Sequence, residues 1–309
     1  MHKYIIKRVL ALIPIFIAVS FLVFFLMSFT GDAAYSIAGE NMTADEVDAL
    51  REKMGLNDNI FVRYGRYMNN LLHGDLGTGI YGKDVWEEFS FRLPYTLQLA
   101  CAAMVVTVVI AIPLGITAAL KQNTWLDTTL STIAVAGISV PNFWLGLMMI
   151  ILFSVKLGWL PTSGADEGFK SIIMPAIAAG IGNASLVMRM TRSAMLDNLR
   201  ADFLRTARAK GVEERRVVLR HAMGNALIPI ITIVGSQFSI LIGGTVVVEQ
   251  VFSWPGVGNL IIQGVRGNDY IMVTGCVVMI TVFIAAVLLA VDILYAYVDP
   301  RIKARYSGK

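Results

Sequence analysis

Residues 205–229 read RTARAKGVEERRVVLRHAMGNALIP, a basic and helix-prone stretch within a chain that is otherwise strongly apolar. Long apolar segments lie on both sides of it, at 172–194 and 229–250. A charged element of this length between two such segments predicts an extramembrane connection between two membrane spans. The rest of the sequence shows which spans it joins and what it contacts.

The composition predicts an integral membrane protein. Of the 309 residues, 56% are hydrophobic and 16% are charged, whereas soluble domains carry about 25% charged residues. Ionisable residues are nearly absent from the apolar segments, as expected when a central Arg, Lys or Asp costs about 2.5–3.5 kcal/mol on insertion. The basic residues flank these segments, and this distribution disfavours nucleic-acid binding.

Six segments are long enough to cross a membrane, since a spanning helix needs about 20 mainly apolar residues. They are 9–29, 95–119, 128–155, 172–194, 229–250 and 270–291. The first is longer than the roughly 7–15 apolar residues of a signal-peptide core, so we interpret it as a true span. We therefore predict an all-α membrane fold with six transmembrane helices.

The predicted spans divide the chain into three parts. Residues 1–30 hold the N-terminal tail and first helix, 31–92 form a large segment between the first two helices, and 93–309 form the core with a loop at 197–228. Most Lys and Arg residues lie at the two chain ends and in that loop. By the positive-inside rule both termini and the loop are cytoplasmic, and 31–92 is extracytoplasmic.

The extracytoplasmic segment contains a predicted amphipathic helix. Thr43 and Glu46 have the spacing of a capping box, and Val47, Leu50 and Met54 fall on one helical face. Two compatible roles stay open for the segment. It can cover the ends of the spans, or it can dock an extracytoplasmic partner.

We find no motif for catalysis or for a cofactor. The glycine-rich stretch GDLGTGI at 74–80 lacks the Gly-Lys-Ser/Thr of a phosphate loop. The three histidines are scattered, so no metal-ligand spacing is present. Both cysteines lie inside predicted spans, as small apolar packing residues do. The chain is predicted to be neither an enzyme nor a metal-binding protein.

The loop at 197–228 is predicted to form two helices around Gly211. The first ends at Lys210 and a helix-stopping Gly211, and the second opens with Glu213 and Glu214 near its positive end. The apolar face of the second helix is predicted to consist of Val217, Leu219, Met223 and Leu227. The residues alone leave two interpretations open: the pair docks a soluble protein, or it lies on anionic lipid.

The same stretch resembles the cytoplasmic coupling loop of ABC-importer permeases. The general loop has Glu-Ala-Ala, three residues and then Gly; alignment on Gly211 places Arg205, Thr206 and Ala207 opposite Glu-Ala-Ala, and only Ala207 matches. The form RTARAKG is, however, typical of the dipeptide/oligopeptide/nickel class. The resemblance therefore indicates that subclass and transfers no glutamate role to Arg205.

Other segments extend the resemblance over nearly the whole chain. They are LREKMGLNDNIFVRYGRYMNNLLHGDLGTGI at 50–80, SVPNFWLGLMMIILF at 139–153, VVVEQVFSWPGVGNLI at 246–261 and DILYAYVDPRIKAR at 292–305. Together they look most like the first, B-type, of the two permease subunits of this class.

The resemblance implies a heteromeric transporter in a bacterial or archaeal plasma membrane. The implied partners are a second homologous permease, two cytoplasmic ABC ATPases that bind ATP and Mg²⁺, and an extracytoplasmic substrate-binding protein. It also implies that ATP-driven motion enters this chain through the coupling loop. The implied contact residues are Arg205, Thr206, Ala207, Arg208, Ala209, Lys210, Gly211 and Glu213.

The resemblance implies di- and oligopeptides as cargo, with nickel chelates, glutathione and opines as alternatives within the class. A stand-alone channel or ion-coupled carrier is the alternative from a different class. It is disfavoured because the spans lack the chain of ionisable residues typical of such proteins.

Two segments are candidates for the gate or pathway. Pro141, followed by Asn142, predicts a kink inside the third span. After the fifth span, Phe252, Trp254 and Pro255 either anchor the chain at the membrane interface or form part of an outer gate. Glu249 is the acid nearest that mouth, and we consider it a candidate contact for a peptide ammonium.

Overall fold

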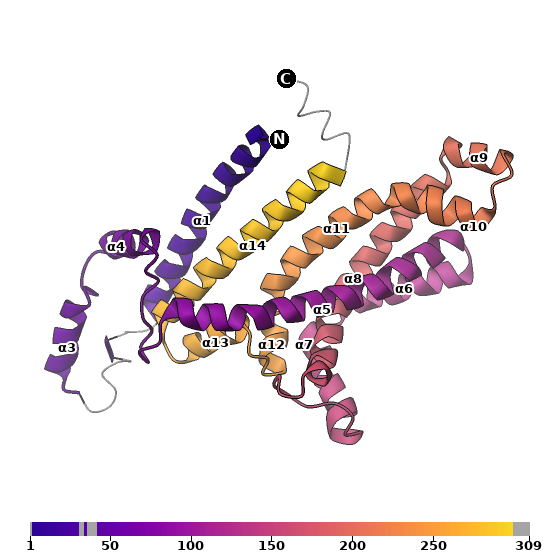
Figure 1. Cartoon of the computed structure of the whole chain (residues 1–309). Coiled ribbons are helices and arrows are strands. Elements are labelled where there is room, and N and C mark those ends of the chain that lie inside the picture. Colours follow the sequence, from indigo (N-terminus) through magenta and orange to yellow (C-terminus); the bar gives the residue numbers. More distant parts are fainter. Residues whose placement is uncertain (1, 31–33, 36–41, 299–309) are drawn as a thin grey trace. The chain divides into compact units, whose positions relative to one another are not determined.

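The computed structural model describes residues 2–30, 34–35 and 42–298. The basic residues at 301–309, which contributed to the predicted orientation, lie outside this range. Helices dominate the described residues (Figure 1), and the only β feature among them is an isolated bridge between Thr78 and Asp84. The predicted all-α fold is confirmed.

The helices follow one another with short connections. In chain order they are α1 His2–Thr30, α3 Ala44–Lys53, α4 Ile60–Leu72, α5 Val85–Leu120, α6 Trp125–Ser139, α7 Asn142–Met149, the π-helix η2 Ile150–Lys156, α8 Phe169–Leu199, α9 Asp202–Ala209, α10 Glu214–Arg216, the π-helix η3 Val217–Ala222, α11 Met223–Gly244, α12 Val246–Val251, α13 Val257–Arg266 and α14 Tyr270–Val298.

Five stretches of described helix are long and apolar enough to cross a membrane. They are Leu10–Phe29, Val85–Leu120, Phe169–Leu199, Glu214–Gly244 and Tyr270–Ile293. These stretches contain or overlap the first, second, fourth, fifth and sixth predicted spans. The third predicted span is different, because two helical pieces with a sharp bend take its place.

The directions of α6 and α7–η2 differ by 95°. The two pieces therefore make a sixth span only if helices separated by such a bend are counted as one broken span. The predicted kink at Pro141 is confirmed, and it is a complete break. Val140 is extended with φ −83° and ψ 119°, because the residue before a proline avoids the helical region. Pro141 is likewise extended and precedes the first turn of α7.

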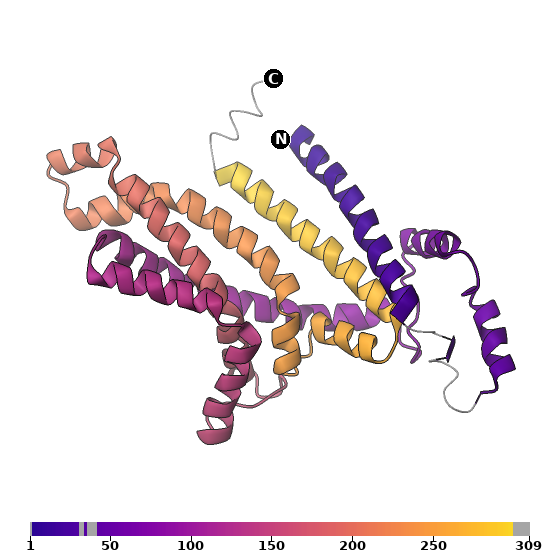
Figure 2. The ribbon, with the colours of Figure 1, turned by 180° about the vertical axis from the view of Figure 1, so that it is seen from behind.

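The chain forms two compact units, and we describe each separately. Among the described residues, the first comprises residues 2–5, Leu97–Trp254 and residues 287–298. Its central helix is α8, which packs against α6, α7 and α11 (Figure 2). Small residues allow close approach: a Cβ on Gly180 of α8 would lie 2.7 Å from the Ala103 carbonyl oxygen of α5.

The second unit comprises Ile6–Thr96 and Pro255–Ala286. Its helix α3 confirms the predicted cap, since the Glu46 carboxylate accepts hydrogen bonds from the Thr43 backbone N–H at 2.8 Å and hydroxyl at 2.9 Å. These bonds lower the pKa of Glu46. Val47 is buried and Leu50 and Met54 pack against the same cluster, so the predicted apolar face is also confirmed.

The turn after α4 docks onto the start of α14 within this second unit. The Asp269 carboxylate accepts a hydrogen bond from the backbone N–H of Ile80 at 3.0 Å and another from that of Met272 at 3.0 Å. A Cβ on Gly79 would overlap this carboxylate. Gly79 is therefore required for the close approach, and the turn is fixed in place.

Candidate functional site

The element formed by residues 199–229, which we call the coupling element, connects α8 to α11 at one end of the first unit (Figure 1). Helix α9 ends at Ala209 with Lys210 as its C-cap, and Gly211 follows with a left-handed φ of +76°. The Gly211 N–H donates to the Arg208 carbonyl oxygen at 2.9 Å. The predicted helix stop is confirmed. Glu213 precedes α10 in an extended conformation and thus begins the second helix, as predicted.

The inner face of the coupling element is anchored in a buried apolar cluster. Leu204 of α9 has no exposed surface. It packs with Ala119 of α5, with Ala194 and Met195 of α8, and with residues of η3 and α11. Burial of one leucine side chain stabilises a fold by about 1.5–3 kcal/mol. Helix α9 is therefore fixed to the helix ends beneath it.

The outer face of the coupling element is exposed. Of the predicted contact residues, Arg205, Thr206, Arg208, Ala209, Lys210, Gly211 and Glu213 are exposed in this structure. Ala207 is the exception, because it packs against the buried cluster. Phe203, which the sequence did not single out, is 44% exposed on the same helix. The element thus offers a mixed apolar and basic surface.

A bidentate ion pair closes the turn around Gly211. The Arg208 guanidinium donates through Nε to Glu214 Oε2 at 3.0 Å and through Nη2 to Oε1 at 2.8 Å. The adjacent carboxylate raises the pKa of Arg208. Both side chains are substantially exposed, so the pair contributes at most about 1 kcal/mol. It holds the two short helices at a fixed spacing.

The predicted apolar face of the second helix is partly wrong. Val217 is buried as predicted, but Leu219 is 53% exposed and Leu227 is 38% exposed. The buried residues are instead Val217, Val218, Ala222, Ala226 and Ile230. Val217–Ala222 form a π-helix, whose wider turn shifts the inward face relative to a 3.6-residue period.

The two candidate gate segments meet within the first unit. Pro141 and Asn142 begin α7, which packs against α12. A Cβ on Gly146 of α7 would lie 3.0 Å from the Phe252 ring, and the Gly164 N–H donates to the Phe252 carbonyl oxygen at 2.9 Å. The broken third span therefore contacts the exit of the fifth. Pro255 is half-buried and begins the last segment of the second unit.

The aromatic side chains after the fifth span are not interface anchors. Phe252 and Trp254 are 2% and 1% exposed, so both are covered by protein. Glu249 is also fully buried, and its Oε1 accepts a hydrogen bond from the Thr245 hydroxyl at 3.1 Å. In this conformation a solute cannot reach Glu249.

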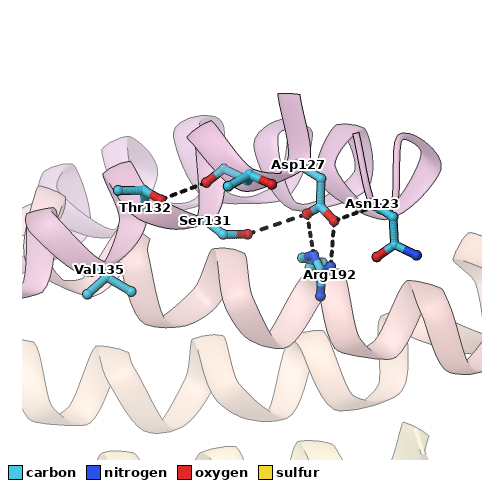
Figure 3. A pocket seen from close by; sticks show the side chains of 7 residues that line it. Asn123, Asp127, Ser131, Thr132, Val135 and Arg192 are labelled. Atoms are coloured by element: carbon cyan, nitrogen blue, oxygen red, sulfur yellow. Dashed lines mark hydrogen bonds and ion pairs between the residues drawn. The ribbon is translucent and has the colours of Figure 1, made fainter. Parts of the chain in front are cut away.

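Sequence reasoning missed one ion pair between membrane helices. Asp127 in the first turn of α6 binds Arg192 of α8 through two bonds (Figure 3). The pair borders an open hollow of about 500 Å³, which is also lined by Asn123, Thr128, Ser131, Thr132 and Val135. The two residues are 65 positions apart. The only available signal was a pair of opposite charges, with Asp127 directly before the predicted span at 128–155 and Arg192 inside the predicted span at 172–194.

Comparisons with known proteins agree with this architecture. The family described as "Binding-protein-dependent transport system inner membrane component" matches residues 111–304, and the N-terminal family of the same systems matches residues 1–100. The glutathione transport system permease protein GsiC of Salmonella paratyphi A is 42% identical over 98% of this chain and 99% of its own length. GsiC of Escherichia coli is 41% identical with the same coverage.

The fold also matches a solved transporter. A chain of the MetNI methionine ABC transporter superposes with a TM-score of 0.59, at 20% identity, and covers 68% of this chain and 96% of that chain. The relatives of the present chain are permease subunits of ABC transporters. In such systems ATP hydrolysis belongs to the partner ATPases. The chain therefore belongs to the family of binding-protein-dependent transport system inner membrane components, and it is a permease subunit of an ABC importer of the dipeptide/oligopeptide/nickel class.

Proposed function

We propose that this permease forms, with a second homologous permease, the pathway for small peptides that include glutathione, and that two cytoplasmic ATPases drive it. The observation that carries the proposal is the coupling element, which is anchored through Leu204 and exposed around Gly211. An element fixed on one face and free on the other is suited to pass a partner's motion to the helices beneath it.

The proposed orientation places the coupling element and both termini in the cytoplasm. Residues from Thr206 to Gly211 then lie at the centre of the contact with one ATPase, and ATP and Mg²⁺ stay on that partner. The segment at 31–92 faces outward, where a substrate-binding protein delivers the cargo. ATP binding shifts the population between inward-open and outward-open states, which requires different contacts in the two states.

The proposed gate is the contact between the broken third span and the exit of the fifth. Pro141 and Asn142 supply the break, while Phe252 and Trp254 pack at the exit with Pro255 after them. Glu249 would meet the ammonium of a peptide only after this contact opens. The burial of all three side chains, Glu249, Phe252 and Trp254, supports a closed gate.

Support for the cargo comes from the relatives that are named glutathione permeases and are 41–42% identical over nearly the full length. Glutathione is a tripeptide, so it lies within the peptide cargo expected of the class. Dipeptides, longer peptides, nickel chelates and opines are the competing solutes. Specificity is expected to depend mainly on the substrate-binding protein, because the described residues of this permease offer no chemistry that selects one of these solutes.

The test is uptake by the complete transporter in vesicles, with both permeases, the ATPases and the binding protein. Labelled glutathione is compared with a dipeptide, a longer peptide, an opine and a nickel chelate at equal concentration. We expect ATP-dependent uptake of glutathione and lower uptake of the nickel chelate and opine. A preference for either of the last two would overturn the cargo assignment, and solute entry through this chain alone would indicate a channel or carrier.

A second measurement tests the ATPase contact. The double substitution Arg205→Glu and Lys210→Glu reverses two exposed charges on the coupling element, and Lys53→Glu reverses one exposed charge on α3. We expect the double variant to lose most of the co-purifying ATPase and Lys53→Glu to retain it. Equal ATPase recovery in the two variants would contradict the docking assignment.

A further inference from the structure

The ion pair between Asp127 and Arg192 has the geometry of a rigid mechanical link. Arg192 Nε lies 2.6 Å from Asp127 Oδ1, and Nη2 lies 2.6 Å from Oδ2 (Figure 3). Asp127 is 4% exposed. Its carboxylate also accepts the Asn123 backbone N–H at 3.0 Å and the Ser131 hydroxyl at 3.4 Å. A bidentate pair fixes orientation as well as distance.

Stability alone is a weak explanation for such a pair. The Asp127 side chain is 6% exposed and the Arg192 side chain 28% exposed, so removing the carboxylate from water offsets part of the attraction, and such a pair is often replaceable by apolar residues without loss of stability. Helix α6 already packs on α8 through apolar side chains, since Ala134 and Leu130 join a cluster with Ala184, Val187 and Met188. Helices α6 and α8 would therefore pack together without the ion pair. What the pair adds is two bonds of fixed direction between them.

The position of the pair connects it to the coupling element. Arg192 lies on α8 about two turns before its end at Leu199. The turn that leads into α6 is nearby, because Arg200 Nη2 donates to Gln122 Oε1 at 3.3 Å. The apolar cluster that anchors Leu204 draws on α5, α8, α9, η3 and α11, and among its described residues none belongs to α6.

Helix α6 is the first half of the broken third span. It ends at Ser139, and the 95° bend into α7 follows. Near that end α6 touches α8 closely, since a Cβ on Gly137 would lie 2.5 Å from Ser185 Oγ. Helix α7 then packs against α12 of the proposed gate. Motion of α8 thus reaches α7 directly, where the two helices pack together, and also through α6, whose chain continues into α7.

We propose that Asp127 and Arg192 are positioning residues that make α6 follow the coupling element, so that ATPase motion reaches the broken third span. The inference rests on the proposed role of the coupling element and not on the identity of the cargo. The bidentate bonds transmit the displacement of α8 to the first turn of α6.

The first test measures solute transported per ATP hydrolysed by the complete transporter carrying Asp127→Asn or Arg192→Gln. We expect each variant to keep basal ATP hydrolysis and to lower this ratio by at least about fivefold, the lower end of typical coupling between sites. The exchange variant Asp127→Arg with Arg192→Asp restores opposite charges and should recover part of the ratio. Wild-type ratios in both single variants would overturn the proposal.

Two further variants separate positioning from folding. Thr132→Ala changes the same hollow without touching the pair, and its ratio should stay within about twofold of wild type. Arg192→Lys keeps the charge and loses the bidentate geometry, so an intermediate ratio is expected. A wild-type ratio in assembled Arg192→Lys, with loss of assembly in the other variants, would show a purely structural pair and overturn the proposal.

A distance measurement tests the link without reference to the cargo. Spin labels at exposed positions Thr129 on α6 and Asp197 near the end of α8 report whether the two helices move together. In the assembled transporter we expect one narrow distance that is the same with and without ATP, and a broader or ATP-dependent distribution in Asp127→Asn. Identical distributions in both proteins would contradict the link, even if transport itself were confirmed.

Discussion

Two glycine-containing turns in this permease differ in what surrounds them. Gly211 in the coupling element has a left-handed φ of +76° and no atom near the position of its missing Cβ. Gly79 in the outer segment is in crowded surroundings instead, because a Cβ there would overlap the Asp269 carboxylate. Gly211 is needed for its left-handed backbone conformation, and the surface around it is open. Gly79 is needed because a larger residue would keep two segments from touching.

The difference separates a surface that we propose another protein completes from one that the chain completes itself. The outer turn is tied to Asp269 by the N–H of Ile80 and is closed within the second unit. The coupling element is closed only on the side of Leu204, and its other face carries exposed Phe203, Arg205 and Lys210. The following predictions test that distinction, beginning with the largest effect.

Leu204→Ala should produce the largest loss of stability. It leaves a cavity in the anchoring cluster, and truncation of a fully buried leucine costs about 2–5 kcal/mol. We expect a lower midpoint in thermal unfolding of the purified chain in detergent. Phe203→Ala, one position earlier and exposed, should change the midpoint little; equal losses in the two variants would contradict the anchored inner face.

Gly79→Val should cost about 1–3 kcal/mol, because the added carbons force the Asp269 carboxylate away from its partners. The same unfolding measurement checks it. The matched control is Gly65→Ala on α4, where no atom lies within 4 Å of the added Cβ. That control should be neutral or slightly stabilising, since alanine favours a helix over glycine. A stable Gly79→Val chain would remove the distinction between the two turns.

Gly211→Val should cost about 1–2 kcal/mol through the left-handed backbone alone. The strain would distort the exposed turn, so we expect solute transported per ATP to fall while the chain still inserts and assembles. Gly211→Asn tolerates the same backbone and should transport more per ATP than the valine variant. Normal coupling by Gly211→Val would count against the role of this turn.

Arg208→Ala should have the smallest effect on stability, at most about 1 kcal/mol, because the pair with Glu214 is exposed to solvent. A double-mutant cycle with Glu214→Ala measures the pair directly. A coupling energy well above that value would mean that the turn is a closed structure, and the contrast with the Gly79 turn would weaken.

Sequence patterns predicted the features that depend on local chemistry. The apolar spans, the helix stop at Gly211, the cap at Thr43 and Glu46, and the break at Pro141 all follow from residues within a few positions of one another. The resemblance of RTARAKG predicted the family, which the comparisons confirm. The assignment of contact residues in that loop stays a prediction.

Features that depend on distant residues were not predictable in this way. The contacts of Asp127 with Arg192 and of Ile80 with Asp269 join positions far apart in the chain. The apolar face after Glu214 was misassigned because the π-helix at Val217–Ala222 departs from the usual helical period. The burial of Trp254 likewise results from tertiary packing, which a one-dimensional pattern of aromatic residues does not reveal.

The central claim is that the exposed face of the coupling element contacts a cytoplasmic ATPase. The most direct measurement places a photo-crosslinking amino acid at Phe203 in the assembled transporter within native membranes and identifies the adduct by mass spectrometry. The account predicts a covalent adduct with the ATPase subunit that is lost when the ATPase is absent. An adduct with the substrate-binding protein, or with lipid alone while the ATPase is bound, would contradict it.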